Sequence, residues 1–320
     1  MSATEKGHGG AGASAVEEFE ELRPLLFAIS YRILGSVSEA EDAVQDTWLR
    51  WTSVPTRPTS TRAYLSAVVT RVSIDVLRSA RVRREEYVGS WFPEPLLTDP
   101  YEDPERAAQL ADSVSMAALL LLERLTPLER AVFVLREVFG FAFGEVAAAV
   151  GRSEAACRQL AVRARRHMDA GRPRFEADRR EREELAGRFF EAFRAGDVAG
   201  LRELLAADVQ MSGDAGGKAP LWGEGPLLGA ENVTEVLAVL TVRLSAMGVV
   251  LRRRRVNAQP GAVLHDPEGR ILSTMTLDIL DGRIQAIRGV LNPDKLAHLG
   301  PVADAWALAG RADDGEGPAR

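Results

Sequence analysis

The pattern of apolar and polar residues divides the chain into a helical first part and a mixed second part. In the first part, apolar residues recur every three to four positions over residues 16–34, 38–51 and 61–86, which predicts three amphipathic helices. In the second part, two helices are predicted at 182–195 and 198–206, and after about Val249 apolar and polar residues alternate as in strands. Asp281-Gly282 predicts a hairpin turn and 266–269 another turn. We therefore expect an all-helical region followed by an α+β domain.

Residues 143–168 contain the most specific local pattern in the chain. Residues 143–150 form a short apolar-faced helix, which Gly151 ends, and Ser153 is placed to cap a second helix. Two short helices joined by a three-residue turn that contains glycine predict a helix-turn-helix. The apolar positions of the pair are Phe143, Val146, Ala147 and Val150 in the first helix and Cys157, Leu160 or Ala161, and Ala164 in the second.

The outward face of the second helix is basic. It carries Arg158, Gln159, Val162 and Arg166, and residues 151–174 contain seven arginines against two acidic residues. Arginine and glutamine can read base edges in the major groove, and the other arginines can neutralise phosphates. The pattern favours DNA binding. The alternative is a helical hairpin with a solvated basic face.

Two further helices have one-sided charge. Residues 39–46 place Glu39, Glu41, Asp42, Gln45 and Asp46 opposite an apolar side that includes Trp48, which suits either a solvated face or a docking surface for a basic partner. Residues 61–86 carry Tyr64 at the start and a row of arginines. Such a helix can track a single strand and stack an unpaired base, although a plain surface helix fits equally well. Its arginines are Arg62, Arg71, Arg78, Arg81, Arg83 and Arg84.

Helix boundaries and connecting segments are predicted from capping residues and prolines. Ser38 with Glu41 matches a capping box, and Thr126-Pro127 fits the start of the second of two helices within 112–142. Residues 91–111 contain four prolines and are interpreted as a linker, although Trp91 and Phe92 at its start suggest that it packs on something. Residues 1–15 lack an apolar run and are interpreted as a disordered tail.

Composition narrows the function classes. The 320 residues are 46% hydrophobic with a net charge of −6, so the basic face is a local feature of an acidic chain. Cys157 is the only cysteine, which excludes a disulfide within the chain and a cysteine-based zinc cluster. The four histidines, His8, His167, His265 and His298, are too scattered to indicate a metal site. No stretch has the length of a membrane span, and the expected location is the cytoplasm.

Three segments, in order along the chain, resemble the extracytoplasmic-function sigma factors of the sigma-70 family. SEAEDAVQDTWLRW resembles the polymerase-clamp helix, AYLSAVVTRVSIDVLRSARVRR the helix that melts and holds the −10 element, and the segment from Leu125 to Arg166 the domain that reads the −35 element. The resemblance implies a subunit that binds core RNA polymerase and directs promoter-specific initiation. The polymerase contacts implied are Asp42, Gln45, Asp46 and Trp48, and the DNA contacts implied are Tyr64, Arg71, Arg78, Arg81, Ser153, Arg158, Gln159, Arg163, Arg165 and Arg166.

The C-terminal half resembles a SnoaL-like domain, a curved sheet closed by helices, as fused to SigJ-like sigma factors. The three short signatures of that group appear here as WFPEP, DAGGK and NPDKL, with Phe92 and Ala215 as mild departures from a leucine and a glycine. In such proteins the fused domain is taken to act in cis on the sigma core, in place of a separate anti-sigma factor. The interdomain contacts implied are Trp91, Phe92, Pro93, Asp214, Gly216, Gly217, Lys218, Asn292, Pro293, Asp294 and Lys295.

The expected organisation follows from the resemblance. It runs as a disordered tail (1–15), sigma domain 2 (16–90), a linker with WFPEP (91–111), sigma domain 4 (112–170), a second linker (171–180), the SnoaL-like domain (181–298) and a tail (299–320).

Two alternatives concern the last domain. SnoaL-like folds include cyclases and isomerases, for which Asp208, Asp214, His265 and Asp278 are the candidate acids and bases. However, we expect His265 at a rim and Asp214 in a flexible glycine-rich loop, and no nucleophile-base pair is visible. The domain can also bind an unidentified small ligand without chemistry. We expect no enzyme activity, no cofactor, and core polymerase and promoter DNA as partners.

Overall fold

The computed structural model describes residues 9–85, 87–171, 179–220 and 225–313. The chain forms two compact units. One, called here the helical unit, contains the chain up to Arg81 with Asp99–Leu110 and Leu122–Asp169. The other, the sheet unit, contains Val82–Thr98, Ala111–Leu121 and everything from Ala170 onward. The linker is therefore shared, and its first half belongs to the sheet unit.

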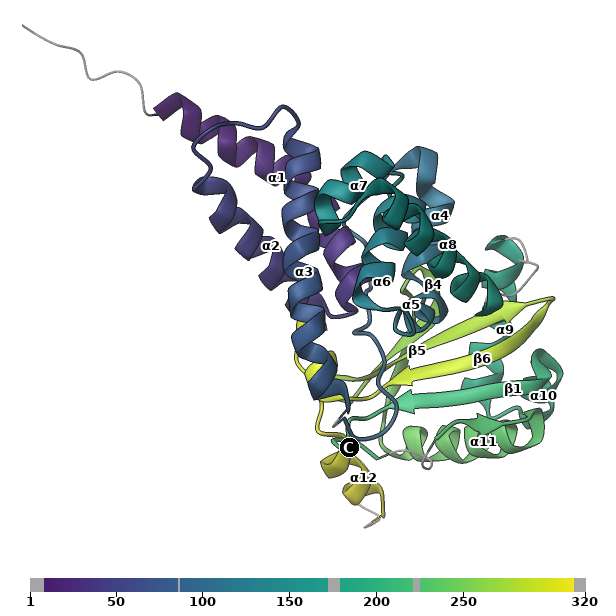
Figure 1. Cartoon of the computed structure of the whole chain (residues 1–320). Helices are drawn as coiled ribbons and strands as arrows, with labels where there is room; N and C mark the ends of the chain where they lie inside the picture. Colours follow the sequence, from purple (N-terminus) through teal and green to yellow (C-terminus); the bar gives the residue numbers. More distant parts are fainter. Residues whose placement is uncertain (1–8, 86, 172–178, 221–224, 314–320) are drawn as a thin grey trace, which may run out of the picture. The chain divides into compact units, whose positions relative to one another are not determined.

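The helical unit begins with α1 (Gly9–Leu34), α2 (Val37–Thr52) and α3 (Thr61–Glu85), the purple and blue helices of Figure 1. Apolar side chains of α1 such as Leu26 and Ile29 are fully buried, as helical spacing predicts. The cap of α2 is Ser36, whose hydroxyl accepts a hydrogen bond from the Glu39 amide at 3.1 Å. The predicted Ser38 cap is wrong because two serines two residues apart compete, and Ser36 has the extended backbone that a cap needs.

The interpretation of residues 1–15 as a disordered tail is wrong for 9–15, which form the first turns of α1. Glycines suggested a tail, but the intervening alanines favour helix. The Ala15 carbonyl also accepts a hydrogen bond from Trp51 Nε1 at 3.0 Å, which ties this end of α1 to α2. Residues 1–8 lie outside the described part of the chain.

The predicted linker 91–111 contains helical structure at its end. A short 3-10 turn η1 (Pro104–Arg106) leads into α4 (Ala107–Val114), and α5 (Met116–Leu122) follows after Ser115. The helix expected from residue 112 therefore starts five residues earlier and is broken in two. Prolines end at Pro104, and from there the sequence has the alanines and spaced apolar residues of a helix.

The second half of the helical unit matches the prediction closely. It consists of α6 (Pro127–Phe133), the π-turn η2 (Val134–Val138), α7 (Phe143–Val150) and α8 (Glu154–Gly171). Thr126 and Glu129 form a reciprocal capping box at the start of α6. Gly151 ends α7 in the left-handed conformation, with φ of 65°, and Ser153 caps α8 through the Ala156 amide at 3.2 Å. The predicted helix-turn-helix is confirmed.

The sheet unit contains one mixed sheet of order β2-β1-β6-β5-β4-β3, in which only the β1–β6 pair is parallel. Its strands are β1 (Leu205–Asp214), β2 (Leu227–Leu228), β3 (Val250–Val256), β4 (Gln259–His265), β5 (Ile271–Leu280) and β6 (Arg283–Val290). The predicted turn at Asp281-Gly282 joins β5 to β6, and both residues have positive φ, as a type I′ turn requires. The predicted turn at 266–269 joins β4 to β5.

Helices and loops cover both faces of this sheet. On one face lie α9 (Arg179–Ala195), α10 (Val198–Leu204) and α11 (Ala230–Ala246), which Figure 1 shows in green beside β1. On the other face a second apolar cluster joins Phe92 and Met116 to the sheet residues Val263, Ile271 and Val290. Alternation along β4 explains the division, since Ala262 and Leu264 face the helices and Val263 faces the linker.

Three expectations for this domain were wrong. The helix predicted at 198–206 ends at Leu204, and β1 follows directly, because alternating burial along 205–214 satisfies a strand. Asp214 is the last residue of β1 and fully buried, not part of a flexible loop. The predicted tail 299–320 contains α12 (Ala305–Asp313), whose Leu308 enters the core. Before it, η3 (Pro293–Lys295) and η4 (Ala297–Leu299) follow β6.

Candidate functional site

A buried ionic cluster in the sheet unit joins the linker to the ends of β1 and β6. The Asp214 carboxylate has no solvent exposure and accepts three hydrogen bonds. Its Oδ2 accepts from the Phe92 amide at 2.7 Å and from Lys295 Nζ at 2.6 Å, and its Oδ1 accepts from the Tyr87 hydroxyl. A buried carboxylate needs such partners to offset its lost hydration.

Lys295 completes what is called here the Asp214–Lys295 cluster. Its ammonium also donates to the Phe92 carbonyl and lies 4.1 Å from the Trp91 ring centre and 4.7 Å from that of Tyr87. A desolvated ammonium against two aromatic faces gains cation–π stabilisation. Phe92 is thus held through its amide, its carbonyl and its buried ring, so the backbone of the linker is fixed and not only its side chains.

Asn292 extends the cluster across the start of NPDKL. Its Nδ2 donates to the Tyr87 hydroxyl at 2.7 Å, and the backbone amides of Leu291 and Asn292 donate to the Asp214 carbonyl at 2.7 and 2.9 Å. Burial, followed by the hydrogen bond to Asp214, raises the pKa of Tyr87 above its ordinary value, so the phenol stays a proton donor.

The glycines of DAGGK permit this close approach. Gly216 has φ of 55°, and a Cβ placed there would meet Asn292 Nδ2 at 2.4 Å and the Tyr87 hydroxyl at 2.7 Å. Gly217 also has positive φ but lies in open space apart from Val88. Ala215 is buried and is not among the positive-φ residues, so alanine fits this position without strain.

A second pair links the same two segments at the surface. Lys218 and Asp294 form an exposed ion pair, with side chains 52% and 64% accessible, whereas those of Lys295 and Asp214 are 8% and 0% accessible. Pro93 is buried beside Phe92, and Pro293 occupies the first position of η3. The structure therefore brings together all eleven residues predicted for the interdomain contact.

Sequence reasoning missed three polar residues that hold the rest of the linker. Asn257 exchanges hydrogen bonds with the backbone of Leu96 and donates to the Val114 carbonyl at 3.0 Å. Gln259 accepts from the Met116 amide at 2.8 Å. Tyr87 is the third. An asparagine with φ of 52° in a tight turn was the available signal for Asn257, whereas nothing local distinguishes Gln259 or Tyr87.

In the helix-turn-helix, the residues predicted to bind DNA lie on the exposed face of α8. Three arginines are paired with carboxylates: Arg158 with Glu154 at 2.8 Å, Arg163 with Glu129 at 3.0 Å and Arg165 with Glu137 at 2.7 Å. Burial opposes ionisation of Glu129, but hydrogen bonds from Thr126 and Arg163 outweigh it and keep its pKa below the ordinary value. Gln159 and Arg166 are exposed on the same helix, and Ser153 is occupied as the cap.

In α3, Arg71 contacts the helix-turn-helix. Its guanidinium donates to the carbonyls of Ala148 and Ala149 at the end of α7, where the helix dipole favours a cation. Arg78 is exposed beside Asp75, and Tyr64 is half-buried near the Trp51 ring. The side chain of Arg81 lies outside the described part of the structure.

Further contacts within the helical unit join α1 to the second helical group. Arg130 of α6 is buried, and it donates to the Ile33 carbonyl at 2.7 Å and pairs with Glu123 at 2.6 Å. Arg32 of α1 is buried and pairs with Asp99 of the linker at 2.7 Å. On α2, Asp42, Gln45 and Asp46 are exposed, and Trp48 is half-buried with its ring 4.9 Å from that of Phe19.

The candidate acids and bases of the enzyme alternative are not brought together. Asp208 is exposed on β1, Asp278 pairs with Arg288, and Asp214 is held by Lys295. His265 ends β4, where burial and then the charge of Arg252 keep its pKa below the ordinary value. Among the described residues, no group of three His, Cys, Asp or Glu side chains is arranged to hold a metal ion. The described helices include none with the length and apolarity to cross a membrane.

Comparisons with known proteins match the whole arrangement. Residues 19–83 match the model of Sigma-70 region 2, and residues 115–168 match that of Sigma-70 region 4. The chain is 38% identical over 289 residues to the ECF RNA polymerase sigma factor SigJ of Mycobacterium tuberculosis, covering 88% of this chain and 92% of that one. It is 30% identical over 280 residues to the probable ECF sigma factor SigI of the same species. The crystal structure of the M. tuberculosis SigJ covers 90% of this chain with a TM-score of 0.71 and 35% identity.

Proposed function

The chain belongs to the extracytoplasmic-function sigma factors of the sigma-70 family, which direct promoter-specific transcription initiation, and we propose that its sheet unit regulates this activity in cis. The single observation that carries the proposal is the capture of Phe92 by the Asp214–Lys295 cluster. Sigma factors bind core polymerase and promoter DNA and are not enzymes, so the cluster has a mechanical role here.

The cis arrangement makes a modest contact sufficient. A tethered domain meets its target at a local concentration near millimolar, so regulation needs no separate tight-binding partner. The captured segment connects the region that contacts the −10 element to the region that reads the −35 element. Fixing it restricts how far apart those two regions can move, and their separation must match the promoter.

The helical unit supports a closed free state. Arg71, which we propose contacts promoter DNA, donates instead to carbonyls of α7, and Arg130 bonds the end of α1. In this state Arg71 is occupied by protein. We propose that polymerase binding separates the two regions and releases Arg71, together with Tyr64, Arg78 and Arg81, for the −10 element.

The remaining contacts are assigned by exposure and chemistry. We propose that Arg158 and Gln159 of α8 read bases and that Arg163, Arg165 and Arg166 bind phosphates, exchanging their present carboxylate partners for DNA. The exposed acidic face of α2, with Asp42, Gln45 and Asp46, would dock on polymerase, supported by Trp48. Asp42→Arg tests the last assignment: core affinity in a pull-down should fall, and an unchanged affinity means that the face is merely solvated.

Trp91→Ala in the full-length chain tests cis regulation. It removes the ring over Lys295 while leaving every proposed DNA contact in place. Linker cleavage in limited proteolysis should accelerate, and run-off transcription with core polymerase should change. Trp306→Ala is the control, because Trp306 is a 56% exposed tryptophan of α12 that lies outside the cluster. Faster cleavage with unchanged transcription would show that the sheet unit only anchors the linker.

A further inference from the structure

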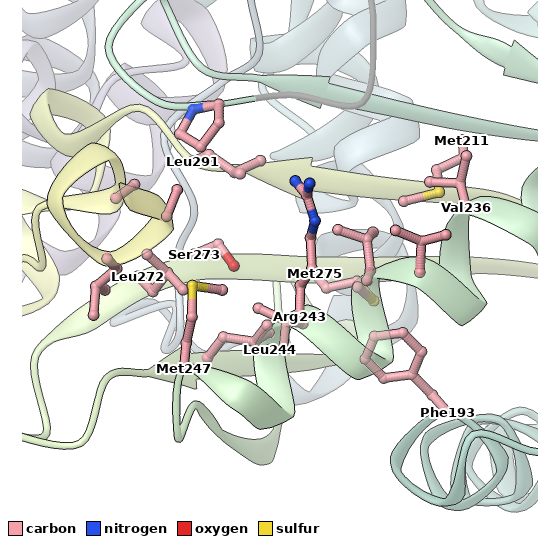
Figure 2. A pocket seen from close by; sticks show the side chains of 18 of the residues that line it. Phe193, Met211, Val236, Arg243, Leu244, Met247, Leu272, Ser273, Met275 and Leu291 are labelled. Atoms are coloured by element: carbon pink, nitrogen blue, oxygen red, sulfur yellow. The ribbon is translucent and has the colours of Figure 1, made fainter. Parts of the chain in front are cut away.

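A cavity in the sheet unit lies on the helix-covered face of the sheet, opposite the linker. Its volume is about 580 Å³, within the range of sites that enclose small ligands. Figure 2 looks into it: α11 forms one wall, the strands the other, and residues of α12 contribute at one end. It is a separate site from the Asp214–Lys295 cluster.

The walls of the cavity are mostly apolar and adaptable. They include three methionines, Met211, Met247 and Met275, together with Phe193 and several aliphatic residues. Methionine side chains adjust to irregular apolar shapes. An apolar hollow of this size facing solvent is unfavourable unless something apolar occupies it. The occupant must therefore have a hydrophobic body.

The polar groups of the cavity are few and separated. Arg243 lines it from α11, and Figure 2 shows its guanidinium extending from the helix over the strands, with the Ser273 hydroxyl on the opposite wall. Glu235 lies eight residues earlier on α11, about 12 Å along a helix axis. A single guanidinium with apolar surroundings suits a carboxylate, which it can bind with two parallel hydrogen bonds.

The cavity and the linker site share backbone. Met211 lines the cavity from β1, the strand that ends at Asp214. Leu291 lines it too, and its amide donates to the Asp214 carbonyl at 2.7 Å. The next residue, Asn292, holds Tyr87. A ligand packed on Leu291 thus acts one residue away from the cluster that captures the linker.

We propose that this cavity binds a hydrophobic carboxylic acid, with its carboxylate on Arg243 and its apolar body among the methionines, and that the ligand alters the hold on the linker. The binding step stands independently, and its consequence for the linker rests on the proposed cis regulation. The ligand is the signal that adjusts the sheet unit.

Binding is tested on the full-length chain by calorimetry with dodecanoate and the uncharged dodecanol. Dodecanoate should bind, and Arg243→Gln should weaken it by about tenfold, the effect of one charged hydrogen-bonding partner, without weakening dodecanol. Arg202→Gln, at an exposed arginine of α10, is the control. Equal affinity for both probes and no effect of Arg243→Gln would overturn the carboxylate assignment. No binding of either probe would overturn the cavity proposal.

Location is tested by filling the cavity from its exposed edge. Val239 lines the cavity and is 57% exposed, so Val239→Trp should fold and abolish binding of both probes. Val242→Trp is the matched control, since Val242 is on the same helix, is 70% exposed and does not line the cavity. Equal binding by the two variants would place the probes elsewhere and overturn the site.

Coupling is tested by limited proteolysis of the linker with and without dodecanoate, using Trp91→Ala as reference. A changed cleavage rate in the unaltered chain, absent in Val239→Trp, supports coupling. Binding without any change in cleavage overturns coupling but leaves the site. If Trp91→Ala itself leaves cleavage unchanged while dodecanoate still binds, the cis-regulator proposal fails and the binding site stands.

Discussion

At the scale of single residues, two lysine–aspartate pairs join DAGGK to NPDKL but lie in opposite environments. Asp214–Lys295 is buried, and Lys218–Asp294 is exposed. Removing one partner of a buried pair leaves an uncompensated charge, whereas an exposed pair is screened by water. The two pairs therefore differ in energetic importance although their sequence neighbourhoods are nearly the same.

Lys295→Met should lower the free energy of unfolding of the sheet unit by about 3 kcal/mol, because the Asp214 carboxylate stays buried without its cation. Lys218→Met should change it by less than about 0.5 kcal/mol. Urea denaturation followed by tryptophan fluorescence measures both. Similar losses for the two variants would mean that the buried pair is solvated in solution.

At the scale of elements, the sequence predicted some features well for physical reasons. Gly151 and Ser153 act locally, through a left-handed residue and a cap, so the helix-turn-helix needed no tertiary information. β1 was missed because its neighbour β6 is distant in sequence, and pairing with β6 decides its conformation. Asp214 was misjudged for the same reason, since its burial depends on Lys295 and Phe92 rather than on the glycines beside it.

The DAGGK loop gives a prediction with an internal control. Gly216→Ala should release the linker, because its Cβ would displace the Asn292 amide and the Tyr87 hydroxyl in addition to straining a positive φ. Gly217→Ala carries only the strain of positive φ, about 1 kcal/mol. Limited proteolysis should therefore cleave the linker faster in the first variant. Equal cleavage rates would show that strain alone matters.

For α8, the two kinds of arginine should separate by specificity. Arg158→Ala should cost about 1–3 kcal/mol of binding free energy on the cognate −35 element and relax the preference at one base pair. Arg165→Ala should weaken cognate and scrambled DNA alike and flatten the salt dependence, because it removes a phosphate contact. Fluorescence anisotropy over a salt series measures both. Equal losses on the two DNAs for Arg158→Ala would remove it from base reading.

At the scale of the whole molecule, the activity of a sigma factor depends on the separation of its two DNA-binding regions. Within the helical unit, Arg71 and Arg130 join those regions directly, which no local pattern in the sequence indicated. The bonds involve backbone carbonyls, so the contact tolerates sequence change on one side and depends on two arginines on the other. A closed free state and an open polymerase-bound state follow from this arrangement.

Energy transfer between two dyes can detect the opening. Cysteines introduced at Ser79 of α3 and Val162 of α8, both exposed, carry donor and acceptor, while the native Cys157 is buried. Transfer should be high in the free chain and should fall when core polymerase is added, because the two regions must spread to the promoter spacing. Adding Arg71→Ala should lower transfer in the free chain, since the bonds to Ala148 and Ala149 are lost, and Arg78→Ala, at an exposed arginine of the same helix, should not. Equal transfer with and without polymerase would mean that the regions do not separate on binding, and the closed-state mechanism would be wrong.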